Sequence, residues 1–509
     1  AGPVVAIFLP HPARRARRVD CPRTSTGLDV PASGGRRRSC QTRDVGTEAE
    51  RGLGFVDAES ATTQLHATLQ VAASRFPDDF APAGFPDDAS AFRASYPEVL
   101  PRFEAARVGS GRRAEIARVI VDAARERLVM QPDRTPIGEA VSRPAPPFPT
   151  EIQRFGPSSG LRPRVVLDGV EQQGSALADA VFAMVDRGSA SPPVGEAIAW
   201  IVDRAGRDGI DLSGRRIAIL GAAAELAPTR LWLEGGADVL WIDVADPPPE
   251  LLDRGDLGGT LRWVPGGADL LTDADRVRAT IEEFAGGEPV DVGLYAYAGG
   301  SAREWRLTAA MNAIVDALPE GVVQGVALLV SPTTCGVLSD ADLAGEAERR
   351  ANAPWWQRGL ERVGALGRGG GHTLVGETAT NRGVVSIQGG SYQGAQYVGK
   401  LLAAEVWATA DATINVSANT AGVSLTESMQ HPVFQTAFAG ASALGVETFA
   451  PSTTVALNGL LTLHDRLDPE AADRALDDLF ATRVHGGLYV TPYPIDPALR
   501  VAAALGVMK

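Results

Sequence analysis

Cysteine, histidine and lysine are scarce in this chain. Its 509 residues include three cysteines, Cys21, Cys40 and Cys335, whose spacing fits neither a set of metal ligands nor a disulfide framework. Its six histidines form no His-x-His or His-x-x-x-His pair, which argues against a zinc site. The cysteines therefore indicate free thiols in a reducing compartment, and we expect a cytoplasmic protein without a bound metal.

Long apolar runs and an excess of positive charge are also missing. No hydrophobic stretch approaches the roughly 20 residues that a membrane-spanning helix needs. The formal net charge of −14 argues against nucleic acid and against an anionic membrane as partners. Hydrophobic residues make up 45% of the chain, which is enough for a sizeable core. We expect a soluble homo-oligomer that acts on a small-molecule substrate.

Changes in composition divide the chain into three parts. Residues 1–45 are rich in Arg and poor in acidic residues, like a transit peptide, but we expect an unstructured tail because Pro, Gly and Ser interrupt every helix. Residues 46–150 are expected to form a helical region, with helical periodicity over 105–129, and to end in a Pro-rich linker at 144–149. Residues 151–509 alternate strand and helix patterns.

The alternating pattern of the third part predicts an α/β fold. It is typical of a doubly wound parallel sheet, which is Rossmann-like, here with an N-terminal mainly helical extension. Ligands bind such sheets at the carboxyl ends of the strands. A helical insertion at about 335–382 is either a structural addition or a substrate lid. The expected strands are 164–167, 216–220, 239–242, 290–295, 325–330, 383–387 and 412–416.

A strand, a tight turn and a helix form a candidate nucleotide site. Gly221 and Ala222 begin the turn, whose backbone N–H groups would face a pyrophosphate at the start of the next helix. The following strand ends at Asp243, where a carboxylate can hold the ribose hydroxyls of NAD and would repel the 2′-phosphate of NADP. A plain βαβ unit with a solvated Asp243 is the alternative. The pattern favours NAD over NADP.

Lys400 is the one internal lysine, since 46 of the 48 basic residues are Arg and the other lysine is Lys509. A planar guanidinium does not replace a compact ammonium, so this choice indicates a chemical requirement rather than a solvated helix face. An ammonium can lower the pKa of a phenol that exchanges a proton with a substrate oxygen. Tyr392 and Tyr397, eight and three residues before Lys400, both remain candidates for that phenol.

Further motifs follow one another between about residues 212 and 430. Glu304-Trp305 is followed by Asn312, seven residues after the Trp. The other motifs are the turn at 221–228, Ala268-Asp269-Leu270, the segment 290–299 ending in Ala298-Gly299, and the segment 414–426 ending in Thr426.

Together these motifs resemble the short-chain dehydrogenase/reductase superfamily. The distance from Tyr392 to Lys400 and the form of the turn are similar to the enoyl-thioester reductases, a divergent branch. The resemblance implies a hydride transfer between NAD(H) and a carbonyl or enoyl substrate, and an acyl thioester is the narrower expectation. The implied catalytic residues are Tyr392 or Tyr397, Lys400, Asn312, which supports the lysine through water, and Ser331 or alternatively Ser391. The implied cofactor-binding residues are Gly221, Ala222, Asp243, Asp269, Ala298, Gly299, Lys400 and Thr426.

Two departures from the family pattern keep other functions open. Gln396 stands four residues before Lys400, where the family has its Tyr, and Glu225 and Ala227 stand where the common turn has glycines. A carboxylate beside a pyrophosphate is unfavourable. The first alternative is therefore a catalytically degenerate member that serves as a binding or assembly protein. The second is an S-adenosylmethionine-dependent methyltransferase, because a strand, a Gly turn, a helix and a strand ending in Asp also occur in that fold.

Overall fold

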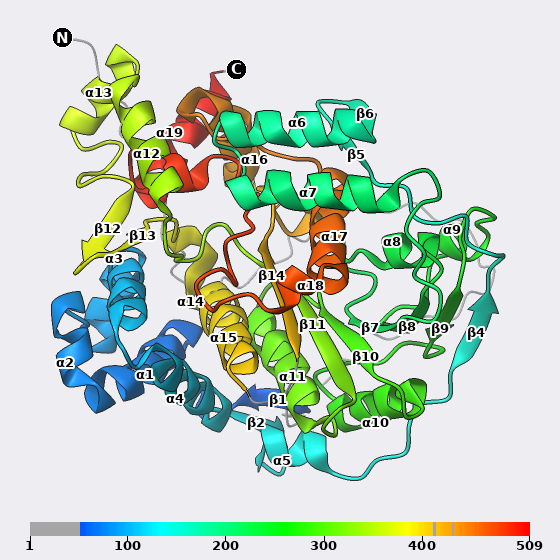
Figure 1. Ribbon diagram of the computed structural model, residues 1–509. Helices are drawn as coiled ribbons and strands as arrows, with labels where there is room; N and C mark the ends of the chain where they lie inside the picture. The colour runs from blue at the N-terminus through cyan, green and yellow to red at the C-terminus, as the bar shows by residue number, and fades with distance from the viewer. Residues whose placement is uncertain (1–50, 411–413, 430–431, 509) are drawn as a thin grey trace, which may run out of the picture. The chain divides into compact units, whose positions relative to one another are not determined.

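A seven-stranded β-sheet is the centre of the fold (Figure 1). The structure is a computed structural model that describes residues 51–410, 414–429 and 432–508, so the expected tail at 1–45 lies outside the described residues. Six strands are parallel, and β4 at one edge is antiparallel to its neighbour. In spatial order the strands are β14 (Asn415–Thr420), β11 (Val323–Val330), β10 (Val290–Leu294), β7 (Arg216–Leu220), β8 (Asp238–Ile242), β9 (Thr260–Trp263) and β4 (Glu151–Arg154).

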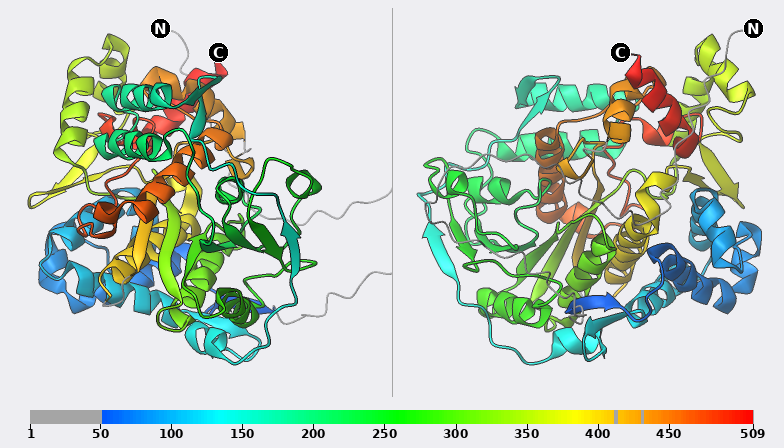
Figure 2. Two further views of the ribbon diagram at one scale, coloured as in Figure 1. Left: turned by 45° about the vertical axis from the view of Figure 1, so that its right-hand side comes forward. Right: turned by 180° about the vertical axis from the view of Figure 1, so that it is seen from behind.

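Helices cover both faces of this sheet, as Figures 1 and 2 show. Successive residues of a strand point to opposite faces, so Ile217 and Ile219 join one core, while Ala218 and Leu220 join the other. The prediction of an α/β fold with a largely parallel sheet is therefore confirmed. One face is covered by α6 (Ser175–Asp186), α7 (Pro192–Ala205), α8 (Thr229–Glu234) and α17 (Pro451–Leu467), and the other by α10 (Ala274–Ala285), α11 (Arg303–Ala317) and the segment from α14 (Gly389–Gln393) to α15 (Ala403–Ala408).

The N-terminal helical region shares its core with the sheet. The ring of Phe55 meets the ring of Trp305 edge to face, with 5.3 Å between the centroids. The helical periodicity over 105–129 corresponds to the end of α3 and to α4, which are separated at Ser110 and Gly111, and its last residues enter β2. This region comprises α1 (Ala61–Arg75), α2 (Pro77–Phe80), α3 (Ala89–Gly109), α4 (Arg113–Glu126), α5 (Ile137–Ser142) and a small sheet of β1 (Gly52–Phe55), β2 (Leu128–Gln131) and β3 (Thr135–Pro136).

Two expected strands do not join the central sheet. The strand at 164–167 exists as β5 (Arg164–Leu167), but it pairs antiparallel with β6 (Val170–Gln173) in a separate hairpin. The prediction of a strand at 383–387 is wrong, because the chain enters a short 3-10 helix at Ser386. The N–H of Ser386 donates to the Asp496 carboxylate and not to a neighbouring strand. The prediction missed β9 and β4, which are only four residues long.

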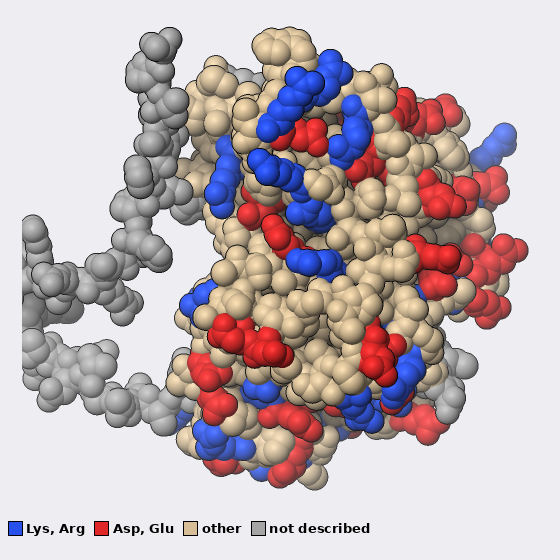
Figure 3. Space-filling model, turned by 90° about the vertical axis from the view of Figure 1, so that its left-hand side faces the viewer, with Lys and Arg blue, Asp and Glu red and all other residues tan. Residues whose placement is uncertain are grey.

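The insertion and the C-terminal segment lie side by side. Trp356 and Leu360 of the insertion pack against Ala437 of α16 and Ala498 of α19. Figure 3 views the side that carries α13 and shows Arg side chains gathered towards the top, with acidic side chains at its right edge and bottom. No helix of the described segments has the length and apolarity to cross a membrane. The elements are α12 (Asp340–Ala351), α13 (Trp355–Arg362), β12 (His372–Val375), β13 (Thr378–Asn381), α16 (Pro432–Ala441) and α19 (Ile495–Val507); elsewhere lie α9 (Pro249–Leu252) and α18 (Pro469–Ala472).

Candidate active site

A cavity of ≈ 470 Å³ opens at the carboxyl ends of four parallel strands. Its walls include the turn after β7, the ends of β10 and β11 and the loop after β14. Its volume lies in the range of small-molecule sites, and its position is where ligands bind open α/β sheets. Of the predicted site residues, it brings together Tyr392, Lys400, Ser331, Ala298, Gly299 and Thr426.

The helix that carries Tyr392 and Lys400 is wound as a π-helix over Gly394–Leu402. Such helices are rare and occur frequently at functional sites. Two glycines let it approach α11: a Cβ on Gly394 would lie 2.2 Å from the ring of Trp305, and one on Gly399 would lie 2.6 Å from Thr308. The amide of Asn312 donates to the carbonyl of Gly399. Trp305 and Asn312 of α11 thus both contact the π-helix, at Gly394 and Gly399.

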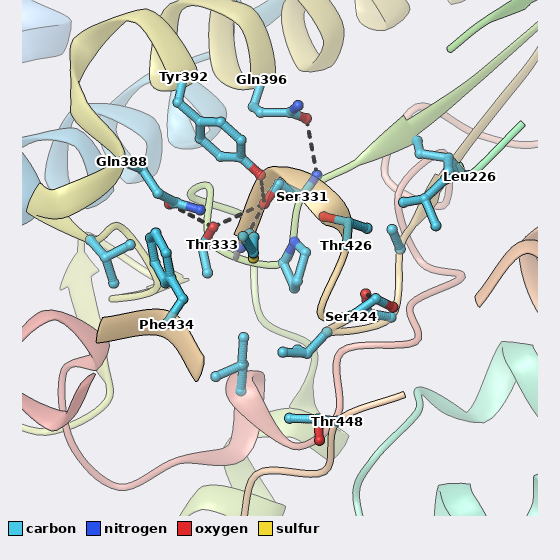
Figure 4. A pocket seen from close by; sticks show the side chains of 18 of the residues that line it. Leu226, Ser331, Thr333, Gln388, Tyr392, Gln396, Ser424, Thr426, Phe434 and Thr448 are labelled. Carbon is cyan, nitrogen blue, oxygen red and sulfur yellow. Dashed lines mark hydrogen bonds between the residues drawn. The ribbon is translucent and has the colours of Figure 1, made fainter. Parts of the chain in front are cut away.

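Tyr392 heads a network of hydroxyl groups in the cavity (Figure 4). Its phenol donates to Ser331 Oγ at 2.7 Å, and Ser331 Oγ lies 2.9 Å from Thr333 Oγ1. Thr333 in turn donates to Gln388 Oε1 at 2.8 Å. Burial raises the pKa of Tyr392, against the lowering effect of the Ser331 bond. The phenol therefore remains protonated at neutral pH.

Lys400 is buried at the wall of the cavity. Its Nζ donates to the carbonyl of Leu329, near the end of β11, at 3.0 Å. Loss of solvation lowers the pKa of Lys400 to about 8. At pH 7 the ammonium form still predominates. The charge of Lys400 is not among the causes of the Tyr392 shift, so in this state the structure does not support the predicted lowering of the phenol pKa by Lys400.

No functional role was predicted for Gln396, which stands where the family has its Tyr. In the structure its side chain lines the cavity. Its Oε1 accepts the N–H of Ser331 at 3.2 Å, so Gln396 and Tyr392 hold Ser331 from the backbone and the side chain. Sequence reasoning also missed Thr333, Gln388 and Tyr297 as cavity residues. The available signal was the spacing of four from Tyr392 to Gln396 and again from Gln396 to Lys400.

Three predicted residues lie near the cavity without lining it. Tyr397 is fully buried on the other side of the π-helix, where its phenol donates to Glu104 Oε2 at 2.7 Å. Ser391 donates to Glu304 at 2.6 Å. Asn312 is bound to the π-helix backbone as described above. Of the two candidate tyrosines and two candidate serines, the cavity contains Tyr392 and Ser331.

The predicted nucleotide turn has the expected backbone shape. Gly221 has a φ of +85°, and a Cβ there would lie 2.2 Å from the N atom of Ala296, so the turn requires glycine. The N–H of Ala223 donates to the Asp243 carboxylate at 2.9 Å. The carboxylate of Glu225, a residue that lines the cavity, accepts the N–H of Glu427 at 2.9 Å.

Four predicted cofactor residues lie beyond the walls of the cavity. Asp243 directly follows β8 and is half-buried. Asp269 accepts the N–H of Leu271 at 2.9 Å, which indicates a role in its own loop. Within the described chain, no residue of the insertion at 335–382 lines the cavity. The four residues are Gly221, Ala222, Asp243 and Asp269.

One end of the cavity, near β11, places polar groups beside small residues. It combines the Lys400 ammonium, the Thr426 hydroxyl and the small residues Ala298 and Gly299, which leave space beside the strand ends. Comparisons with models of protein families and with curated proteins found no match for the chain.

Proposed function

We propose that this protein is a nicotinamide-dependent oxidoreductase that acts on a carbonyl or enoyl substrate. One observation carries the proposal: Tyr392 is hydrogen-bonded to Ser331 in a cavity that also contains the Lys400 ammonium. The order of the strands supports it. Numbered in chain order, the six parallel strands run 3-2-1-4-5-6, the order typical of dinucleotide-binding folds, and the cavity lies beside the β7–β10 pair, where that order reverses.

In this function Tyr392 is the proton donor. A substrate oxygen next to the Tyr392 and Ser331 hydroxyls would accept a hydrogen bond from each. The raised pKa of Tyr392 keeps its proton available until negative charge develops on that oxygen. Tyr392 would then regain a proton from Ser331 Oγ, which would take one from Thr333 Oγ1, and the half-buried Thr333 would take one from solvent.

The remaining residues would hold the cofactor, which supplies or accepts the hydride when bound. Lys400 would contact the nicotinamide ribose, and Thr426 the carboxamide. The second oxygen of Asp243, beside the one that accepts from Ala223, would bind the adenosine ribose and would disfavour a 2′-phosphate. This arrangement favours NAD(H) over NADP(H).

Thermal unfolding with added NADH, NADPH or S-adenosylmethionine tests the proposal. A ligand at about a hundred times its Kd stabilises the folded protein by roughly 2.7 kcal/mol. We expect the largest rise in Tm with NADH and a smaller one in the Lys400→Met variant, which lacks the ribose contact. Stabilisation by S-adenosylmethionine alone would contradict the proposal.

A binding protein without turnover is the second candidate. The Glu225 carboxylate lies in the turn that would receive a pyrophosphate, and the Ala223 N–H is already bonded to Asp243. Both features weaken a phosphate site. For this candidate, NADH would not change the Tm, and a Glu225→Gly variant would gain NADH binding.

A further inference from the structure

The cavity has two chemically different ends. Hydroxyl, amide and ammonium groups gather at the end near β11, whereas the end between α16 and α19 is lined almost entirely by hydrocarbon. In Figure 4, Phe434 of α16 and Leu226 of the turn lie on opposite sides of the hydroxyl network. Among the described residues, the charged ones that line the cavity are Lys400, Glu225 and Glu427, and the last two are bonded to each other at the turn.

The apolar arm, as we call the second end, is formed by residues of α16, α19 and the segments beside them. The phenol of Tyr493 donates to the carbonyl of Leu444 at 2.8 Å, so this polar group is satisfied within the protein. The residues of the apolar arm are Phe434, Ala437, Phe438, Ala441, Leu444, Val446, Leu488, Tyr493, Ile495, Ala498, Leu499 and Ala502.

Close packing of the two helices fixes the far end of the apolar arm. A Cβ on Gly440 would lie 1.9 Å from the carbonyl oxygen of Ala502, and one on Gly506 would lie 1.8 Å from that of Thr436. The backbones of α16 and α19 are thus in direct contact, and the insertion packs behind them. Because the helices cannot separate cheaply, the small side chains of Ala437 and Ala498 set how much space remains.

We infer that the substrate carries an unbranched or cyclic apolar tail that occupies this arm, and that Ala437, Ala498 and Phe438 determine its length. The inference rests on the proposed function only for the position of the reacting oxygen beside Tyr392. A tail of hydrocarbon matches a wall without charged groups, since each methylene transferred from water into such a wall strengthens binding about fourfold. A charged tail would lose its solvation without finding a partner.

A series of neutral methyl ketones, the 2-alkanones of about four to about twelve carbons, tests the inference by calorimetric titration. The titrations use the full chain in the presence of NAD⁺, which cannot reduce the ketone, so that the Kd is measured at equilibrium. We expect the Kd to fall about fourfold with each methylene until the arm is full, and then to level off. A Kd that does not depend on chain length would overturn the inference.

Variants then locate the end of the arm. Leu has three more carbons than Ala, so Ala498→Leu should move the levelling point about three carbons earlier, and Ala437→Leu on the opposite helix should do the same. Phe438→Ala should move it later. Ala504→Leu, on the exposed side of α19, is the matched control and should leave the series unchanged. An unmoved levelling point in folded Ala498→Leu and Ala437→Leu would place the tail elsewhere.

Oxidation of NADH, measured with the same ketones and with their α,β-unsaturated counterparts, separates this inference from the proposed function. Binding that strengthens with chain length but without oxidation of NADH by either series would support the apolar arm and contradict the oxidoreductase. Turnover that is equal for short and long ketones would support the oxidoreductase and contradict the apolar arm.

Discussion

Tyr392 and Tyr397 lie five residues apart on one helix, yet their surroundings differ completely. The phenol of Tyr392 donates to a neutral hydroxyl in a cavity, whereas that of Tyr397 donates to the Glu104 carboxylate in the interior. Burial and the neighbouring Glu104 raise the pKa of Tyr397 well above its ordinary value. The chemistry available to a tyrosine here depends on what packs against its side of the helix. Because the Tyr397 phenol is bonded to Glu104 of α3, one of the N-terminal helices, it is not available to a ligand in the cavity.

The interior side of the helix is held by an ion cluster. Arg107 donates to Glu104 and to Glu405 through four hydrogen bonds of 2.7 to 2.8 Å, and Arg113 also contacts Glu405. Burial opposes ionisation, but Arg107 and Arg113 hold the pKa of Glu405 below its ordinary value. The cluster connects α3 and α4 to α15, which follows the π-helix. One side of the helix is therefore fixed by charges and the other is left for a ligand.

The largest expected effect is on the cavity side. Tyr392→Phe removes the proton donor while keeping the ring. The kcat for reduction of a ketone should therefore fall about 10²- to 10⁴-fold, with little change in Tm. The measurement is steady-state oxidation of NADH, using a 2-alkanone long enough to fill the apolar arm. A Tyr392→Phe variant with near-normal kcat would mean that Tyr392 is not the proton donor and that the two tyrosines do not differ in this respect.

Breaking the ion cluster should give the largest loss of stability. Arg107→Met leaves the buried Glu104 carboxylate without its cation and Glu405 with Arg113 alone, which should lower the free energy of unfolding by about 3–5 kcal/mol. Denaturant unfolding measures this loss. Arg118→Met, an exposed arginine of α4, is the matched control and should unfold like the original protein. Equal stability of the two variants would mean that the cluster does not hold the helix.

Tyr397→Phe should have a smaller effect of the opposite kind from Tyr392→Phe. It removes a hydrogen bond to a buried carboxylate, so the free energy of unfolding should fall by about 1.5–3 kcal/mol. The value of kcat should stay within a few-fold of the original, because Tyr397 does not reach the cavity. A loss of kcat as large as that of Tyr392→Phe would show that the assignment of Tyr392 as the proton donor is wrong.

The difference between the tyrosines also marks how far the sequence could be interpreted. Hydrophobic residues that recur every two or every 3.6 positions predicted most strands of the central sheet and most helices that cover it. The rarity of lysine indicated Lys400. The choice between Tyr392 and Tyr397 was not predictable, because it depends on Glu104, 293 residues away in the chain. The apolar arm was missed for a related reason. The helices α16 and α19 are Ala-rich, and only their contact in the folded chain creates the cavity wall.

Lys400 provides the smallest and most specific test of the cavity side. Its pKa is about 8 in the folded protein and about 10.4 in an unfolded chain, so the unfolded state binds more protons between these values. Stability should therefore rise with pH in this window, by about 1 kcal/mol between pH 8 and pH 9. More than about one pH unit below 8 both states are protonated, and the cost of burying the ammonium is constant. Lys400→Met has no such group. The difference in unfolding free energy between the original protein and this variant should therefore increase with pH by the amount stated. Buried tyrosines titrate in both proteins and cancel in that difference. A difference that stays flat from pH 8 to pH 10 would mean that Lys400 titrates as an ordinary solvated amine, and its role beside the nicotinamide ribose would lose its physical basis.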